Sequence, residues 1–218
     1  MNEQDIDPRM LALFEFRARK GDFKKLEIIQ AAIDCLAELG LENTTYEALA
    51  LKLGTRRAHI AYHFSDKNQI FLSAVKFILG TYQQTVVDAL SKVPNQKSAR
   101  PLLQAYVKAA FAWAKQNPSQ LQCMLLLYYL TTIQKEYLEL HNEVRAGGVE
   151  RLAYLYGLEF KGKLTAAELK LHAKSLQNLL SGSLMDAVTT QSTTLSQAEA
   201  NTLKFLDFQW QFLNACKN

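Results

Sequence analysis

Glycine and proline are scarce in this chain, and that scarcity constrains the fold more than any other feature. Only 9 glycines and 4 prolines occur among 218 residues, and no turn dipeptide separates alternating apolar runs. Apolar residues instead recur at intervals of three and four, the spacing of one helix face. The chain is therefore predicted to be all-α. Helices are expected over residues 23–39, two short segments within 44–63, 65–90, 102–115, 119–132, 135–156, 165–189 and from 196 onward.

Side chains suited to helix ends set these boundaries. A Ser or Thr followed three residues later by Glu has the spacing of a capping box. This spacing occurs at Thr44–Glu47, Thr165–Glu168 and Ser196–Glu199. Ser65 is expected to cap the long helix that follows it. Gly147–Gly148 is a candidate kink or break inside a helix.

The segment Tyr46–His63 predicts a helix-turn-helix. Leu49 and Leu53 are four residues apart and share one face of a first helix. Gly54 can adopt the positive φ that a tight turn needs. Ile60 then returns an apolar side chain toward the first helix. A pair of short helices packed in this way is the basis of a common DNA-binding motif.

The side chains left outward on the second helix can donate hydrogen bonds or carry charge; they are Arg56, Arg57, His59 and Tyr62. A short helix with such a face, held by a partner helix, fits the DNA major groove. The formal charges from Lys52 to Lys67 sum to +3, so the basic excess lies on this segment. We therefore expect double-stranded DNA as a partner. The alternative is an ordinary helical hairpin with a basic face toward solvent.

The bulk composition indicates a soluble, cytoplasmic protein. The chain is 49% hydrophobic and 21% charged, and its net charge of +4 permits nucleic-acid binding without requiring it. Its three cysteines are widely spaced among apolar neighbours, so they are expected to be small core side chains in a reducing compartment. The first residues do not resemble a secretory signal, and the apolar run 121–130 is too short to cross a bilayer.

Motifs of helical enzymes are missing. A di-metal bundle needs paired Glu-x-x-His motifs, whereas Glu168 and His172 are four residues apart and alone. There is no glycine-rich phosphate loop, Gly-x-Ser-x-Gly elbow or His-Glu-x-x-His zinc pair. We expect no catalytic residue, metal or cofactor, and an all-helical enzyme is the alternative that these absences disfavour.

The last two expected helices carry more apolar side chains than one interior face can bury. In the final helix a second apolar face, formed by Phe205, Phe208 and Phe212, adjoins the first. A helix with two apolar stripes needs a second partner, so we expect a four-helix interface in a homodimer. The residues assigned to it are Leu179, Leu180, Leu184, Val188, Leu203, Leu206, Trp210 and Leu213. The open alternative is a monomer in which both helices are central.

Residues 26–75, taken as one block, resemble the TetR family of bacterial transcriptional regulators. The resemblance is carried by Ile28–Ala32, Leu39–Thr45, Leu49–Gly54 and His63–Lys67. Beyond this block it rests on helix content and length alone. The family implies an N-terminal three-helix DNA-binding domain and a C-terminal domain that dimerises and often binds a small molecule.

The resemblance also implies contacts with DNA. His59 lies where the family often has a base-contacting residue, and Lys67 matches a lysine that usually contacts the DNA backbone from a helix start. The full set of expected DNA contacts is Thr44, Thr45, Arg56, Arg57, His59, Tyr62, His63 and Lys67. Two positions depart from the family pattern: Ala61 replaces a usual Tyr, and Thr55 replaces a usual apolar residue.

We divide the chain into an N-terminal arm (1–22), a helix-turn-helix domain (23–67) and a helical regulatory and dimerisation domain (68–218). Arg17, Arg19 and Lys20 give the arm a basic end that could contact DNA. The apolar residues of the arm could equally fold against the body, and the sequence leaves both possibilities open.

Together these features predict a homodimeric regulator, a repressor released by a small hydrophobic or aromatic ligand. The dimer would place two recognition helices about 34–36 Å apart on a palindromic operator. The residues proposed to line the ligand site are Phe111, Trp113, Met124, Tyr128, Tyr129, Tyr137 and Met185. The alternative is a regulator-fold protein that acts through protein or ligand binding without recognising an operator.

Overall fold

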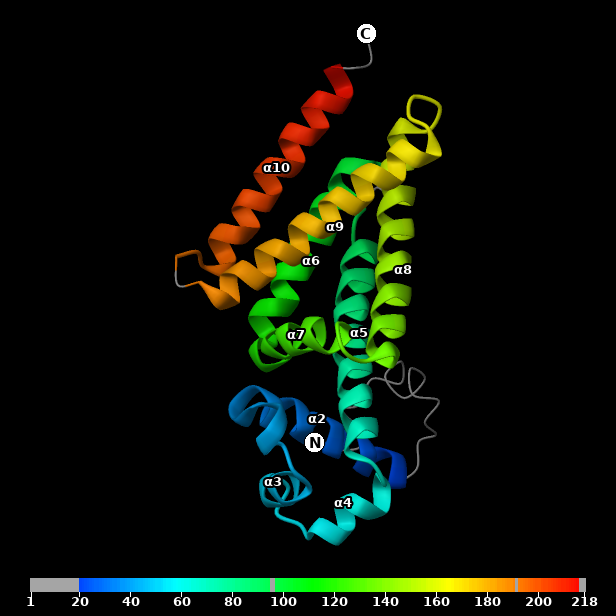
Figure 1. Cartoon of the computed structure of the whole chain (residues 1–218). Coiled ribbons are helices and arrows are strands. Elements are labelled where there is room, and N and C mark those ends of the chain that lie inside the picture. The colour runs from blue at the N-terminus through cyan, green and yellow to red at the C-terminus, as the bar shows by residue number, and fades with distance from the viewer. Residues whose placement is uncertain (1–19, 95–96, 191, 216–218) are drawn as a thin grey trace. The chain divides into compact units, whose positions relative to one another are not determined.

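The computed structural model describes residues 20–94, 97–190 and 192–215, and every regular element in these ranges is a helix (Figure 1). The all-α prediction is confirmed. The helices are α2 (Lys20–Asn43), α3 (Tyr46–Lys52), α4 (Arg57–His63), α5 (Lys67–Ser91), α6 (Ala99–Gln116), α7 (Pro118–Thr131), α8 (Lys135–Phe160), α9 (Ala166–Thr189) and α10 (Leu195–Ala215). Most of the proposed N-terminal arm, with Arg17 and Arg19, lies outside the described residues.

The described chain forms two compact units. The first contains the described residues up to Tyr82 together with Pro118–Tyr137, and the second contains Gln83–Asn117 and the described residues from Leu138 onward. Helices α5 and α8 contribute residues to both units. The domain boundaries drawn above from the sequence stay a prediction.

Helix α2 is central in the first unit. Its predicted stripe, which includes Leu26, Ile29 and Ile33, is buried, and α3, α4 and α7 all pack against it. On α7 the Cys123 thiol donates a hydrogen bond to the Ile33 carbonyl at 3.5 Å. Burial raises the pKa of this thiol to about 12. Cys35 and Cys123 are therefore buried core side chains, as expected.

Among the described helices, α5 is long and apolar enough to cross a membrane by length and composition, but 44% of its most apolar window is buried inside the protein. Ile70, Ala74 and Ile78 on this helix are almost inaccessible. The packing of these residues indicates that α5 contributes to the core of the protein.

In the second unit α10 packs against α6 and α9. Leu206 and Trp210 of α10 are buried, and the Trp210 ring meets the Phe160 ring edge-on at 4.9 Å between centroids. An ion pair of 2.7 Å joins Arg100 of α6 to Asp207 at the exposed edge of this contact.

The Gly147–Gly148 pair does not break its helix. Helix α8 is continuous from Lys135 to Phe160, so the predicted kink is wrong and the helix ends later than predicted. Gly148 is buried, and a Cβ placed on it would collide with the amide nitrogen of Gln177 on α9. The Gln177 side chain therefore occupies the space that a side chain at position 148 would need, whereas Gly147 has open space around its Cα.

The capping residues differ from the predictions at three helix starts. Thr45, not Thr44, caps α3 by accepting from the Ala48 N–H at 3.1 Å. Asp66, not Ser65, accepts from the Asn68 N–H at 3.0 Å at the start of α5. Thr194 and Gln197 form the box at α10 instead of Ser196–Glu199. The Thr165–Glu168 box of α9 is confirmed.

Candidate nucleic-acid interface

The scaffold of α3 and α4 is fixed by buried apolar contacts and by the turn between the helices. Leu49 on α3 and Ile60 on α4 are 1% and 0% exposed. Gly54 adopts φ of 61°, a left-handed value that a residue with a Cβ rarely takes. The Thr55 N–H donates to the Ala50 carbonyl at 2.9 Å and closes the turn. Since a seven-residue helix is not stable alone, this packing is what holds α4 in place.

The opposite face of α4 is exposed. Tyr62 is 84% exposed, and Arg56, Arg57 and His59 are also exposed. In Figure 1 this short helix lies between α3 and the start of α5. The structure thus brings these four predicted DNA contacts together on one short segment.

Arg57 is held by its own unit. Its Nε donates to the Glu47 carboxylate of α3 at 2.6 Å, and its guanidinium lies 5.6 Å from the centroid of the Tyr46 ring. No ion pair is recorded for Arg56 within the described part of the chain. Both arginines were predicted to contact DNA. Arg57 would have to break its ion pair with Glu47 before it could bind a phosphate, whereas Arg56 would not.

The remaining predicted DNA contacts are also engaged locally. Lys67 Nζ donates to the carbonyls of Leu41 at 3.1 Å and Glu42 at 3.4 Å, near the C-terminal end of α2. Thr44 is fully buried and its hydroxyl donates to the Gly40 carbonyl at 2.7 Å. The Thr44 side chain is therefore turned inward, away from where a phosphate could meet it, while Thr45 is half-buried at the start of α3.

Two histidines of α4 form a cluster with Thr55. His59 Nε2 and His63 Nε2 are 3.3 Å apart, and the two ring centroids are 5.1 Å apart. His59 Nδ1 is hydrogen-bonded to Thr55 Oγ1 at 2.9 Å. Burial lowers the pKa of His63, and the neighbouring charges of His59, Lys25 and Lys24 lower it further.

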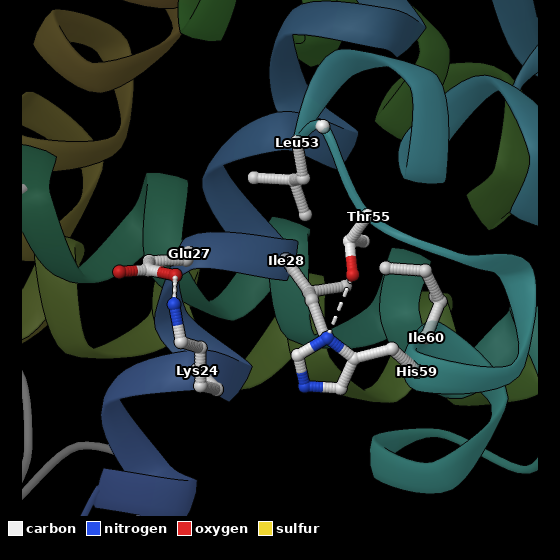
Figure 2. Close-up of a pocket in the computed structure, with 8 residues that line it drawn as sticks. Lys24, Glu27, Ile28, Leu53, Thr55, His59 and Ile60 are labelled. Carbon is white, nitrogen blue, oxygen red and sulfur yellow. Dashed lines mark hydrogen bonds and ion pairs between the residues drawn. The ribbon is translucent and has the colours of Figure 1, made fainter.

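A pocket of about 220 Å³ adjoins this cluster in the first unit. Figure 2 shows Lys24 and Glu27 of α2 across the pocket from Thr55 and Ile60, with His59 facing the same space. Lys24 and Glu27 form an ion pair of 2.6 Å. This pocket is formed between α2 and the turn after α3, so no local sequence pattern predicts it.

The structure does not gather the predicted ligand residues in one unit. Met124, Tyr128, Tyr129 and Tyr137 belong to the first unit, and Phe111, Trp113 and Met185 belong to the second. Tyr129 is 58% exposed. Tyr137 is fully buried, and its hydroxyl donates to Asn68 Oδ1 at 3.0 Å. Burial, followed by the charges of Glu136 and Asp66, raises the pKa of Tyr137 to about 12.

Most of the predicted dimer stripe lies in the core of the chain itself. The buried members are Leu180, Leu184, Leu206, Trp210 and Leu213, whereas Leu179, Val188 and Leu203 are half-buried. The exposed apolar side chains of α10 are instead those of the adjoining face: Phe205, Phe208 and Phe212. The sequence showed both stripes but gave no signal of which one the chain would cover itself.

Gln177 of α9 is a polar residue that was not among the site residues predicted from the sequence. Its Nε2 donates to the Arg145 carbonyl at 3.2 Å. Its Oε1 is buried and has no hydrogen-bond partner among the described residues. Buried acceptors are normally paired, so an unpaired one is a candidate contact for a ligand.

Comparison with known proteins gives a consistent result. The family described as "Bacterial regulatory proteins, tetR family" matches residues 28–74. The regulator named "HTH-type transcriptional regulator BetI" from Proteus mirabilis (strain HI4320) is 24% identical over 197 residues, covering 89% of this chain and 94% of the relative. Its counterpart from Serratia proteamaculans (strain 568) is 24% identical over 187 residues, covering 85% and 92%.

Solved structures share the fold. A transcriptional regulator from Saccharomonospora viridis in complex with choline has a TM-score of 0.75 at 19% identity, covering 85% of this chain and 96% of that one. A TetR transcription regulator from Haloarcula marismortui ATCC 43049 has a TM-score of 0.74 at 16% identity, covering 86% and 98%.

Proposed function

Because the chain belongs to the TetR family of bacterial regulatory proteins, we propose that it is a homodimeric repressor that a small molecule releases from DNA. It is a helix-turn-helix transcriptional regulator and not an enzyme. The observation that carries the proposal is the exposed, basic face of α4 on a scaffold whose opposite face is buried.

In this proposal α4 enters the major groove of each half of a palindromic operator. Arg56, His59 and Tyr62 supply donors to base edges or phosphates, since arginine pairs with guanine edges and all three are exposed. Arg57 joins them when a phosphate displaces Glu47. Lys67 and Thr45 serve at the edge of the contact, where the N-terminal ends of α5 and α3 favour anions.

The test is a titration of the upstream DNA of the gene encoding this protein, with a scrambled duplex of equal length as competitor. Arg56→Ala should weaken binding and reduce the slope of log affinity against log salt by about 0.9 if the residue neutralises one phosphate. Lys174→Ala removes an exposed charge on α9 and should leave both quantities unchanged. No preference for the upstream duplex, or no effect of Arg56→Ala, would favour the alternative that the protein acts without operator recognition.

For the effector we propose a small organic cation with an apolar surface, of which choline is the first to test. The support is the choline complex of the neighbour from Saccharomonospora viridis and the buried aromatic side chains of the second unit, including Phe111 and Trp113. Aromatic faces bind quaternary ammonium groups. The unpaired Gln177 Oε1 would accept a hydrogen bond from the hydroxyl of such a ligand.

Thermal stability with added choline measures this directly, because a ligand of the folded state raises the unfolding temperature. The uncharged isostere 3,3-dimethylbutan-1-ol is the matched control, and Gln177→Ala should reduce the effect of choline. An equal response to both compounds would indicate an apolar effector. No response to either, together with intact operator binding, would reject this effector class.

A further inference from the structure

His59 and His63 lie one turn apart on α4, and we propose that they form a binding site for a divalent transition-metal ion such as Zn²⁺. The site goes beyond the proposed function, since these ligands can hold an ion whether or not the protein binds DNA. It also uses Thr55, a position where the sequence departs from the family pattern.

The distance between the ring nitrogens fits the metal. In a tetrahedral site with Zn–N bonds of about 2.0–2.1 Å, two nitrogen ligands are about 3.3–3.4 Å apart. His59 Nε2 and His63 Nε2 are 3.3 Å apart. Their ring planes are inclined by 51°, so the rings do not stack face to face. Two histidines at i and i+4 on one helix face are a recurrent zinc-binding arrangement.

Thr55 fixes the orientation of the first ligand. Its hydroxyl lies 2.9 Å from His59 Nδ1. When Nε2 binds a metal, Nδ1 carries the ring proton and donates a hydrogen bond to the Thr55 hydroxyl oxygen. A hydrogen bond of this kind at the second ring nitrogen is typical of metal-binding histidines, because it sets both the tautomer and the ring direction.

The charges beside the histidine pair are partly balanced. Lys24 is paired with Glu27 at 2.6 Å, so part of its repulsion toward a bound cation is cancelled. The positive charge of Lys25 also acts on His63 and opposes a bound cation, which favours a weak, exchangeable site.

Water molecules would occupy the remaining coordination positions of the ion. Within the described residues no third His, Cys, Asp or Glu joins the pair. His59 is exposed and borders the pocket of about 220 Å³, which leaves room for bound water. Without metal, the same 3.3 Å separation accommodates an N–H···N hydrogen bond between the two rings, and the experiment must distinguish these states.

The test is calorimetric titration of Zn²⁺ into the full-length protein, free of DNA and of any histidine tag. One ion per chain is expected. His59→Gln and His63→Gln should each abolish binding while keeping the metal-free circular dichroism and unfolding temperature. His141→Gln removes a histidine from α8 and should bind as the parent does. Thr55→Val should weaken binding about 10- to 100-fold, and Thr55→Ser should retain it.

Cobalt gives a second readout that a merely structural role of these residues would not produce. Co²⁺ held tetrahedrally by two imidazoles absorbs visible light, and this absorption should disappear in both glutamine variants. If zinc fails to bind, the two histidines form only a hydrogen bond and the proposal is overturned. It is equally overturned if zinc binds undiminished to His59→Gln and His63→Gln, because the ion then lies elsewhere.

Discussion

In the proposed DNA complex, the carboxylate of Glu47 competes with phosphates for Arg57. The two side chains form an ion pair of 2.6 Å with relative exposures of 61% for Arg57 and 65% for Glu47. A backbone hydrogen bond, followed by the charge of Arg57, lowers the pKa of Glu47, so it stays ionised at pH 7. Since exposed ion pairs contribute little to stability, a phosphate can displace this carboxylate at small cost.

We therefore predict that Glu47→Gln tightens operator binding. The change frees the charge of Arg57 and removes a negative charge from the DNA-facing surface, so the salt dependence should also become steeper. Fluorescence anisotropy of labelled operator at several salt concentrations measures both effects. Glu150→Gln, which breaks an exposed pair with Lys170 in the second unit, is the matched control and should change neither. Weaker binding by Glu47→Gln would show that the pair positions Arg57 for DNA.

Side-chain spacing predicted which residues face outward on α4, but not what they contact. Arg57 pairs with a residue of α3, and Lys67 reaches carbonyls of α2, so both contacts depend on distances between helices. Thr44 and Thr45 are adjacent and chemically alike, yet one is buried and the other caps α3. Their difference is set by the reversal at Gly40, where φ is 78° and ψ is 178°, and no local sequence signal distinguishes them.

Helices themselves were predictable because apolar periodicity reflects burial, which dominates their stability. Their ends were less so, since several Ser, Thr and Asp side chains near each end can cap. Asp66 caps α5 one residue after the predicted Ser65, and Thr194 caps α10 two residues before the predicted Ser196. The predicted break at Gly147–Gly148 failed because a glycine in a helix costs only about 1 kcal/mol, which a helix of 26 residues can tolerate.

The two glycines of α8 give a matched pair of substitutions. Gly147→Ala meets open space and should stabilise the second unit by up to about 1 kcal/mol through helix propensity. Gly148→Ala collides with the Gln177 amide and should forfeit that gain, because Gln177 must leave the Arg145 carbonyl. Urea unfolding measures both. In the double variant Gly148→Ala/Gln177→Ala the stabilising effect of alanine should return. If it does not, a contact other than the Gln177 side chain opposes a Cβ at position 148.

Across the whole molecule, half-buried histidines predict a loss of stability in mild acid. Burial lowers the pKa of His63, His141 and His172 below the ordinary value of 6.5. The unfolded chain therefore binds more protons than the folded chain as pH falls below 6.5, and the free energy of unfolding decreases with it. Above this value the stability should be level, since the histidines are neutral in both states.

Urea unfolding between about pH 7.5 and about pH 5.5 tests this dependence. The variant His141→Gln/His172→Gln should show a shallower decline than the parent. The carboxylate of Glu168, whose pKa is lowered by hydrogen bonds from Thr165, loses its contribution only below 4.5 and leaves this window unaffected. A profile that is flat in the parent would contradict the lowered pKa of these half-buried imidazoles.

The exposed stripe of α10 is the surface on which we expect two copies of the chain to associate. Phe205, Phe208 and Phe212 are 45%, 68% and 64% exposed, and a row of phenylalanines in water is typical of an interface. Phe208→Glu should therefore give a monomer in sedimentation velocity and weaken binding to a two-site operator more than to a half-site. Tyr154→Glu changes an equally exposed residue (68%) on α8 and should stay dimeric. If Phe208→Glu remains a dimer while Leu203→Glu dissociates, the interface is the stripe first predicted from the sequence, and the phenylalanines serve another contact.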